Sequence, residues 1–478
     1  MCYIITMKKE LSRPLDVHRW SEYRVVNTFV NSIYEKHFRW QNPDLIKKHI
    51  KVALLDLYVA WNEHPDMKLG VHMNHNAYKA KSRYNELHIS KKIIDVVNRL
   101  YELNLIDLVT GFYKPNSRFN RVTRIWSTKE LIKQFKQVKF QPYHIQNHIE
   151  RESIILRNSA KKDIKYDDNP DIKRMRSILI EYNQLISRTF IDIPELDEPL
   201  IITKDKYIAV SSNEKFTRRI FNNEIWEDGG RFFGGWWQRV PSEWRTKIYI
   251  NNMQTVEDDY STLHPVLLYA NKGLDYIKLK RGDAYDIEVP NIFNQDDKRK
   301  LVKKLLLIAI NAKTESSAFR AVKSELQEEI PYYSFKFDDL KVVLKNLKEK
   351  HYEIADDFCT GKGLGLMNLD GKIAEYIINK FTNNNIPVLC IHDSFIVPFN
   401  QDNLLRKTMN EGIMQITNQG FPNIDRKGLG FTELNSVKHL DRDLYLDRIK
   451  HLGETAPNRS KGYIYRQQLF EEYLGKEI

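Results

Sequence analysis

The sequence predicts an α+β fold divided among several domains. Helical patterns dominate residues 1–200, whereas strand-like runs and helices alternate after residue 200. The chain has 478 residues, enough for two to four domains of roughly 100–200 residues each. Hydrophobic residues make up 42% of the chain and aromatic residues 12%, so it can bury real cores and is not a disordered chain.

The charge balance favours a polyanionic partner. The chain carries 75 Lys and Arg against 63 Asp and Glu, a formal net charge of +12. A cation placed near a phosphate releases a counterion, which makes basic proteins suited to nucleic acid. The alternative explanation of the positive charge is that the lysines only keep the protein soluble.

Cysteine usage and the apolar runs indicate a cytoplasmic protein, or one in the host cytoplasm if it is phage-borne. The three cysteines, Cys2, Cys359 and Cys390, form no close pair, which argues against a disulfide framework or a cysteine-rich zinc site. The first ten residues lack the order of a secretion signal. The longest apolar run, 305–310, is far shorter than a bilayer requires, so no membrane partner is expected.

Residues 90–128 predict a helix followed by two strands. Ser90 can cap a helix over 91–103, in which apolar residues recur at helical spacing. An extended stretch then reaches a turn at 115–117, and 121–128 returns as a strand. This order resembles the winged-helix DNA-binding domains of replication initiators. We expect phosphate contacts from its basic residues, Lys91, Lys92, Arg99, Lys114, Arg118, Arg121 and Arg124. An ordinary packing unit with a solvated charged face is the alternative.

The composition also suggests four regions. Residues 1–135 form the helical and winged-helix region, and 136–200 a helical linker or thumb-like region ending near two prolines. Residues 201–440 hold the interleaved strands and helices. Residues 441–478 read as a basic tail that becomes ordered in part only on binding.

An acidic pair closes the first chemically informative segment, 248–270. Two strand-like runs flank Asn251 and Asn252, and the second ends in Asp258 and Asp259, just before a helical stretch. Carboxylates at a strand end can coordinate a hard cation together with backbone oxygens. An acidic cap on the following helix is the alternative.

The second informative segment is a hairpin. Residues 388–391 and 395–397 are strand-like, and His392, Asp393 and Ser394 occupy the tip between them. A tight hairpin turns its tip side chains out of the sheet, which suits metal binding. A buried hairpin with a hydrogen-bonded aspartate in its turn is the alternative.

The third informative segment is a helix over 296–313. Arg299 and Lys303 lie four residues apart and so share one face, which Leu307 and Asn311 continue. An arginine fork and a lysine point charge leading to a less polar platform suit a triphosphate. An amphipathic surface helix is the alternative.

The order of these segments resembles the family A DNA polymerases and the related phage-type single-subunit RNA polymerases. Asp259-Tyr260-Ser261 matches motif A, and His392-Asp393 matches motif C. Arg299, Lys303 and Leu307 match motif B, although Asn311-Ala312 replaces its Tyr-Gly. The resemblance covers about residues 230–400. It implies a polymerase right hand, with an antiparallel palm sheet and helical fingers near 270–380, preceded by the helical winged-helix region.

The resemblance also implies a chemistry: template-directed DNA synthesis without proofreading, from a plasmid, phage or mobile element. Asp259 and Asp393 would hold two Mg²⁺ ions, with Mn²⁺ as a substitute. The remaining roles fall into two groups. Nucleoside triphosphate would be bound by Arg299, Lys303, Leu307, Asn311, Tyr260 and His264. DNA primer–template would be met by Gln238, Arg245 and His392.

Two other functions stay open on the sequence. An RNA polymerase or primase could use the same palm, because Asn311 could donate a hydrogen bond to a ribose 2′-hydroxyl. His264 is bulky where the RNA-synthesising members have glycine, which favours deoxynucleotides. A non-catalytic DNA-binding replication initiator is the second alternative, and the joint presence of both aspartates with Arg299 and Lys303 speaks against it. The sequence leaves the oligomeric state open.

Overall fold

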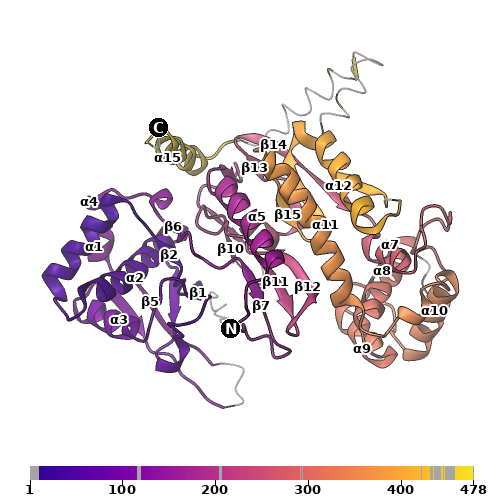
Figure 1. Cartoon of the computed structure of the whole chain (residues 1–478), viewed down its shortest axis with the longest axis horizontal. Helices are drawn as coiled ribbons and strands as arrows, with labels where there is room; N and C mark the ends of the chain where they lie inside the picture. The colour runs from indigo at the N-terminus through magenta and orange to yellow at the C-terminus, as the bar shows by residue number, and fades with distance from the viewer. Residues whose placement is uncertain are drawn as a thin grey trace, which may run out of the picture.

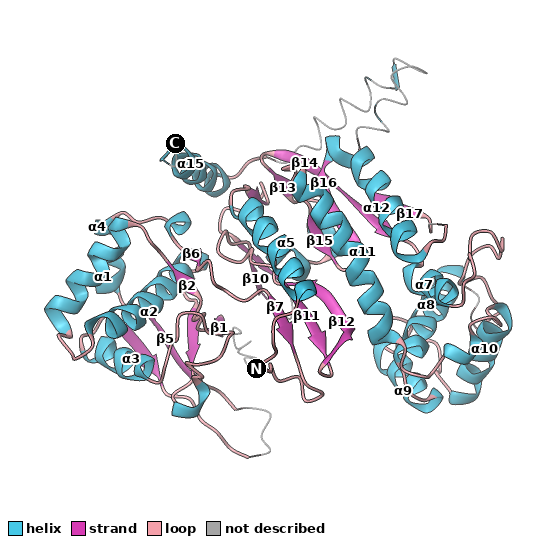
Figure 2. Cartoon of the chain, in the orientation of Figure 1, coloured by secondary structure: helices cyan, strands magenta, loops and turns pink. Residues whose placement is uncertain are grey.

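The computed structural model confirms a mixed α+β fold (Figure 2). It describes residues 10–115, 120–203, 207–290, 292, 294–420, 422–430, 434, 443–444, 446 and 458–476. Helices and sheets form a row, from an N-terminal unit through a set of central sheets to a group of helices at the opposite end (Figure 1).

The N-terminal unit packs helices against a four-stranded sheet with the order β1-β3-β5-β4, in which β1 is parallel to β3 and the other pairs are antiparallel. The helix and two strands expected over 90–128 are present as α3, β4 and β5. The elements are β1 (Ser12–Pro14), β2 (Arg19–Trp20), α1 (Arg24–His37), α2 (Pro43–Glu63), β3 (Lys68–Val71), η1 (His75–Ala77), α3 (Lys92–Glu102), β4 (Ile106–Val109), β5 (Thr123–Ser127), α4 (Lys129–Val138), η2 (Pro142–His144) and β6 (Gln146–Asn147).

This unit has a hydrophobic core of its own. The core runs from Val26 to Ile145 and includes the whole buried face of α2, together with an aromatic group around Phe135. Helix α3 contributes Ile93, Val97 and Leu100, the residues whose spacing predicts the helix.

The central sheets lie beside this unit. A three-stranded sheet holds β7 (Ile154–Leu156), β11 (Arg218–Asn222) and β12 (Ile225–Phe233), and β9 (Leu200–Ile202) pairs with β10 (Tyr207–Ala209). The largest sheet is antiparallel, in the order β15-β16-β14-β13-β8, and β17 pairs with β14. Its strands are β8 (Ile191–Asp192), β13 (Tyr249–Ile250), β14 (Met253–Tyr260), β15 (Leu389–Ile391), β16 (Ser394–Pro398) and β17 (Ile424–Lys427).

Helices cover these sheets and continue into the far helical group. Helix α11 packs on β12 and also contacts α5, α7, α8 and α12, so it ties the sheets to the group formed by α8, α9 and α10 (Figure 1). One continuous core joins both parts. The elements are α5 (Pro170–Ser187), η3 (Trp236–Arg239), α6 (Ser242–Arg245), α7 (Leu263–Asn271), α8 (Gln295–Asn311), α9 (Glu315–Leu326), α10 (Phe337–Lys350), η4 (Ala355–Asp357), α11 (Gly363–Asn383), η5 (Phe399–Gln401) and α12 (Asp402–Thr417).

Two segments are more closely built into the fold than composition suggests. Helix α5, in the region expected as a linker or thumb-like element, packs in the same core as the central sheets. The end of the tail, expected to become ordered in part only on binding, forms helix α15 (Lys461–Lys476). Its Tyr463 and Phe470 pack on Phe190, and Arg466 binds Asp192 at 2.7 Å.

Among the described residues, no helix combines the length and the apolar character needed to cross a bilayer.

Candidate active site

Asp259 and Asp393 lie together at one edge of the largest sheet. Strand β14 pairs with β16 so that Asp259 is opposite Ser394, and the Tyr260 backbone N–H donates to the Asp393 carbonyl oxygen at 3.4 Å. The β15–β16 hairpin places His392 at φ 60°, a left-handed conformation that its tight turn requires. Segments far apart in the sequence therefore bring two carboxylates side by side.

The two carboxylates repel each other in a poorly solvated place. Burial and the neighbouring Asp393 raise the pKa of Asp259 to about 7. Burial and Asp370 likewise raise the pKa of Asp393. A divalent cation between them would offset this repulsion, so the pair suits Mg²⁺. Within the described part of the chain, no group of three or more His, Cys, Asp or Glu gathers as a metal site, so water, backbone and substrate oxygens would complete the ligand set.

The preceding aspartate, Asp258, has a different role. It is fully buried, and both of its carboxylate oxygens accept hydrogen bonds of 2.7 Å from Arg426. Arg426 also binds Asp402 at 2.8 Å. Because side chains alternate along a strand, Asp258 and Asp259 face opposite sides of β14. Asp258 is thus neutralised in a structural ion pair, away from the carboxylate pair.

An arginine, a histidine and an aspartate surround the Asp393 side of the site. Arg231, on β12, binds Asp370 of α11 at 2.5 Å, and its Nη2 lies 3.0 Å from His264 Nε2. Helix α11 approaches β12 closely where Gly371 of the helix faces Gly230 of the strand. A side chain at position 371 would not fit, because its Cβ would lie 2.3 Å from the Gly230 carbonyl oxygen. Sequence reasoning passed over Arg231 and Asp370; the only local signal was the paired glycines before Arg231.

Several buried polar atoms near this edge have no hydrogen-bond partner among the described residues. They are the Ser261 hydroxyl and the Nδ1 atoms of His264 and His392. Burial and the nearby Arg231 lower the pKa of His392, which favours its neutral ring. Buried polar atoms are usually satisfied, so these three are available for a bound ligand or ordered water.

Helix α8 brings its cationic face toward the carboxylates. The charge of Lys303 opposes the rise in the Asp259 pKa that burial and Asp393 cause. Arg299, one turn earlier, forms an ion pair with Asp283, and its guanidinium lies 5.0 Å from the centre of the Tyr285 ring. Burial, Asp393 and Asp259 also raise the pKa of Tyr285, so its hydroxyl lies within the electrostatic reach of both carboxylates. No sequence pattern singled out Tyr285, because it sits in a loop without periodicity.

The end of α8 is held by its own contacts. The Asn311 side chain donates to the Leu307 carbonyl oxygen at 2.7 Å. Helix α11 starts directly against it, since a Cβ on Gly363 would overlap the Asn311 amide. Asn311 remains largely exposed, with its second amide hydrogen free of any contact that the structure describes.

Gln238 and Arg245, expected to contact a primer–template, point into the protein instead. The Gln238 amide donates to the carbonyl oxygens of Phe232 and Cys390 at 3.0 and 2.9 Å and accepts from the Gly234 N–H at 3.0 Å. Arg245 binds both oxygens of Glu257, at 3.1 and 2.8 Å. These half-buried side chains brace the loop before β13 against the sheet, so a direct DNA contact would require breaking these hydrogen bonds.

The basic residues of the N-terminal unit are also partly paired. Arg124 is mostly buried and binds Glu10 at 2.9 Å, so it is a poor candidate for a phosphate contact; Arg121 shares Glu10 at 3.3 Å. Lys92 pairs with Asp95 on the exposed surface of α3. Arg99 donates to the His37 carbonyl oxygen, whereas Lys91 and Lys114 are exposed. Arg118 lies outside the described residues.

Comparison with known proteins assigns no family. No protein-family model matches the chain, and no curated protein matches it. Among solved structures, the POL domain of Pol1 from M. smegmatis, in complex with DNA primer–template and dNTP, aligns at a TM-score of 0.30 with 8% identity. The alignment covers 80% of this chain and 70% of that one. A TM-score this low carries no argument about fold or function.

The Asp259 pKa predicts a pH-dependent stability in metal-free buffer. Between its usual value near 3.8 and its folded value of about 7, the folded protein holds a proton that the unfolded chain releases. The free energy of unfolding should therefore fall as pH rises across this window, by up to roughly 4 kcal/mol, and stay low above it. Urea unfolding in EDTA at pH 5 and pH 8 measures this. Asp259→Asn should lack this pH-dependent part of the free energy of unfolding. An equal pH dependence in the wild type and the variant would contradict the prediction.

Proposed function

We propose that this protein is a template-directed nucleotidyltransferase that synthesises DNA. The observation that carries the proposal is the carboxylate pair at the edge of the sheet, with the Lys303 face of α8 turned toward it. Nucleotidyl transfer needs carboxylates for divalent ions and cations for a triphosphate, and this arrangement offers both.

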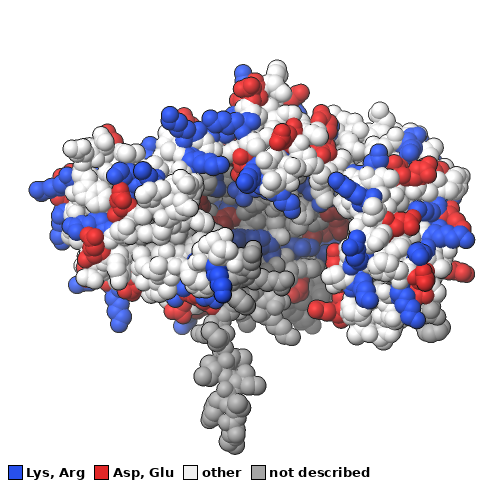
Figure 3. Space-filling view, turned by 90° about the horizontal axis from the view of Figure 1, so that it is seen from below, with Lys and Arg blue, Asp and Glu red and all other residues white. Residues whose placement is uncertain are grey.

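In this proposal the largest sheet is a palm and helices α8 to α10 are fingers. The N-terminal unit, with α3 and the β4–β5 hairpin, is a winged-helix DNA-binding region. The face shown in Figure 3 is hollowed between the N-terminal unit and the far helices, and lysine and arginine side chains lie in and around the hollow, with acidic side chains among them. Cations along a concave surface suit a nucleic-acid duplex.

Each side chain of the site then has a task. Asp259 and Asp393 would hold two Mg²⁺ ions, which when bound stabilise the attacking oxygen and the departing pyrophosphate. Lys303 and Arg299 neutralise the triphosphate, and Arg299 must leave Asp283 to do so. Arg231, fixed by Asp370, holds His264 and presents a cation beside Asp393.

The direct test is extension of a labelled primer on a template by the purified full chain with Mg²⁺. Deoxynucleotides are compared with ribonucleotides, and a template without primer is included. Templated extension with deoxynucleotides supports DNA synthesis. Ribonucleotide use without a primer would instead support a primase or RNA polymerase, and tight duplex binding without any synthesis would support a DNA-binding initiator.

His264 is predicted to control the choice of sugar. In this proposal its buried imidazole, which meets Arg231, is the bulky group that excludes a ribose 2′-hydroxyl, so His264→Gly should increase ribonucleotide over deoxynucleotide incorporation by about 10-fold or more. His264→Gln, which stays bulky and can still meet Arg231, is the matched control and should keep the wild-type ratio. Relative kcat/KM for the two nucleotides measures the effect. An unchanged ratio in His264→Gly would exclude this role.

A DNA-binding region joined to a polymerase without proofreading suits a plasmid, phage or other mobile element. The pairing of the two units in one chain motivates this part of the proposal. Footprinting against element-borne sequences tests it, and binding without any sequence preference would contradict it.

A further inference from the structure

A pocket of about 350 Å³ lies where the N-terminal unit, helix α5 and helix α15 meet. Its lining shares no residue with the aspartate edge. The charged side chains that line it are basic, and none of the described residues lining it is an aspartate or a glutamate. These cations are Arg19, Arg151, Arg188 and Lys215. Such a lining points to an anionic ligand.

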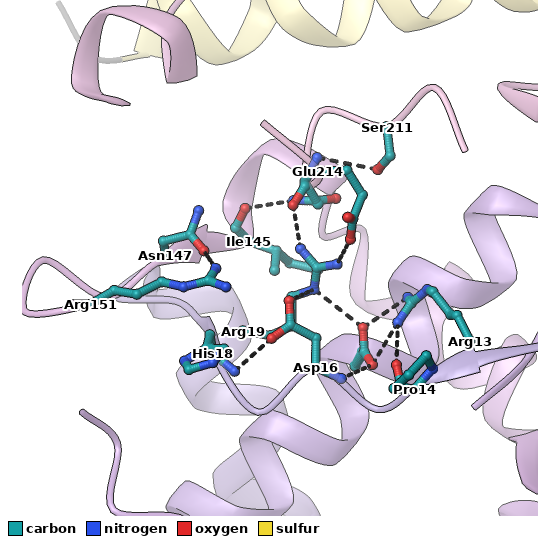
Figure 4. A network of polar contacts seen from close by, with 12 residues as sticks. Arg13, Pro14, Asp16, His18, Arg19, Ile145, Asn147, Arg151, Ser211 and Glu214 are labelled. Atoms are coloured by element: carbon teal, nitrogen blue, oxygen red, sulfur yellow. Dashed lines mark hydrogen bonds and ion pairs between the residues drawn. The ribbon is translucent and has the colours of Figure 1, made fainter. Parts of the chain in front are cut away.

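Two of these cations have partners within the protein that explain their positions. Arg19 binds Asp56 at 3.2 Å and Glu214 at 2.6 Å, in the network that joins the N-terminal unit to the central sheets (Figure 4). Lys215 donates to the Thr189 carbonyl oxygen at 2.8 Å and to the Ile186 carbonyl oxygen at 3.2 Å. These carbonyls lie at the C-terminal end of α5, where a cation is favourable. Both side chains therefore serve the fold.

Arg151 has no comparable partner. Its guanidinium donates to the Asn147 amide oxygen and lies 4.3 Å from the centre of the Phe216 ring, but it forms no ion pair with a carboxylate among the described residues (Figure 4). Burial lowers the pKa of Arg151; the carboxylates of Asp16 and Glu86 offset part of this effect, while Arg218 and Arg19 add to it. A half-buried guanidinium that forms no ion pair can take up a ligand with a negative charge at little cost to the fold.

Ser153 is the second, independent sign of a ligand. It lines the same pocket, its side chain is 1% exposed, and its hydroxyl has no hydrogen-bond partner within the described structure. Buried hydroxyl groups are normally satisfied. A phosphate oxygen next to Arg151 could accept the Ser153 hydrogen and receive the guanidinium fork at once.

The size and walls of the pocket indicate more than a bare phosphate. Its volume falls in the range of small-molecule sites, roughly 300–1,000 Å³. Tyr143, Phe216 and Tyr473 supply aromatic surface, and the Gln184 amide lies on its α5 wall. Aromatic rings beside hydrogen-bonding amides are suited to a nucleobase.

We propose that this pocket binds a nucleoside phosphate, with Arg151 and Ser153 holding the phosphate group. The phosphate comes either from a free nucleotide or from the phosphorylated 5′ end of a nucleic-acid strand. The proposal does not depend on the catalytic function proposed for the aspartate edge.

The test measures binding by the full chain, in EDTA and in a Lys303→Gln background, so that the aspartate edge contributes little. Titration calorimetry uses three probes: ATP, a short 5′-phosphorylated DNA strand, and the same strand with a 5′-hydroxyl. Arg151→Gln and Ser153→Ala are compared with Arg406→Gln, which removes an exposed arginine from α12, away from the pocket lining.

We expect Arg151→Gln to weaken binding of the phosphorylated probe by about 10-fold or more, and Arg406→Gln to leave it unchanged. The melting temperature of Arg151→Gln without ligand should stay close to that of the parent, because the substitution breaks no ion pair among the described residues. ATP binding alone identifies a free nucleotide as the source, and preference for the 5′-phosphate identifies a strand end. Absence of binding to every probe, or equal binding by Arg151→Gln and its parent, overturns the proposal.

Discussion

Asp393→Asn should abolish templated primer extension, lowering kcat by roughly 10³-fold or more, about 4 kcal/mol of barrier. Asparagine keeps the shape of the side chain but removes the charge that a second divalent ion would require. The hairpin tip places Asp393 at the end of β14, where its carbonyl oxygen accepts from the Tyr260 N–H and Asp259 is opposite Ser394. Initial rates of primer extension at saturating deoxynucleotide measure the effect.

The same substitution should stabilise the metal-free protein, which separates a lost charge from a damaged fold. Removing the Asp393 charge relieves the repulsion that contributes to the raised Asp259 pKa, so the melting temperature in EDTA should rise. Asp356→Asn, an exposed aspartate on η4, is the matched control and should change neither rate nor melting temperature. Full activity in Asp393→Asn would exclude the proposed site, whereas lost activity with a lowered melting temperature would indicate misfolding.

Lys303→Gln should reduce kcat/KM for deoxynucleotides by roughly 10- to 100-fold, the value of a charge-assisted contact to phosphate. Lys303 is the residue of α8 whose charge reaches Asp259, so it faces the place where a triphosphate would meet the carboxylates. The loss should appear mainly in KM if the contact is equal in the ground and transition states, and in kcat if it strengthens on reaction.

The neighbouring lysine provides the control. Lys304 binds Glu325 of α9 at 2.8 Å and is turned about a quarter of the helix away from Lys303, so Lys304→Gln should leave kcat/KM near that of the wild type. Equal losses in the two variants would mean that α8 acts through its overall charge rather than through Lys303. No loss in either would remove α8 from the nucleotide site.

Local patterns predicted the elements of the site correctly. The helix over 296–313, the strand ending at Asp259 and the hairpin around Asp393 are present as α8, β14 and the β15–β16 pair. The formation of each of these elements depends mainly on residues close to it in the sequence. Hydrophobic periodicity and turn residues therefore predict it without knowledge of the tertiary contacts. The helical end of the tail was not predicted, because the aromatic face that orders it packs on Phe190 and Tyr143, which are distant in the sequence.

The sequence by itself determined which chemical groups are available and in what order: a strand-end acid, a helix with Arg299 and Lys303, and a hairpin-tip acid. The tertiary structure alone decided the partners. It brought Tyr285 within the electrostatic reach of the carboxylates, joined Arg231 to Asp370, paired Gln238 and Arg245 within the protein, and left Arg151 without an ion pair among the described residues. The reason is physical: a pairing between distant residues depends on how whole helices and sheets pack, and no local spacing encodes which buried charge will meet another.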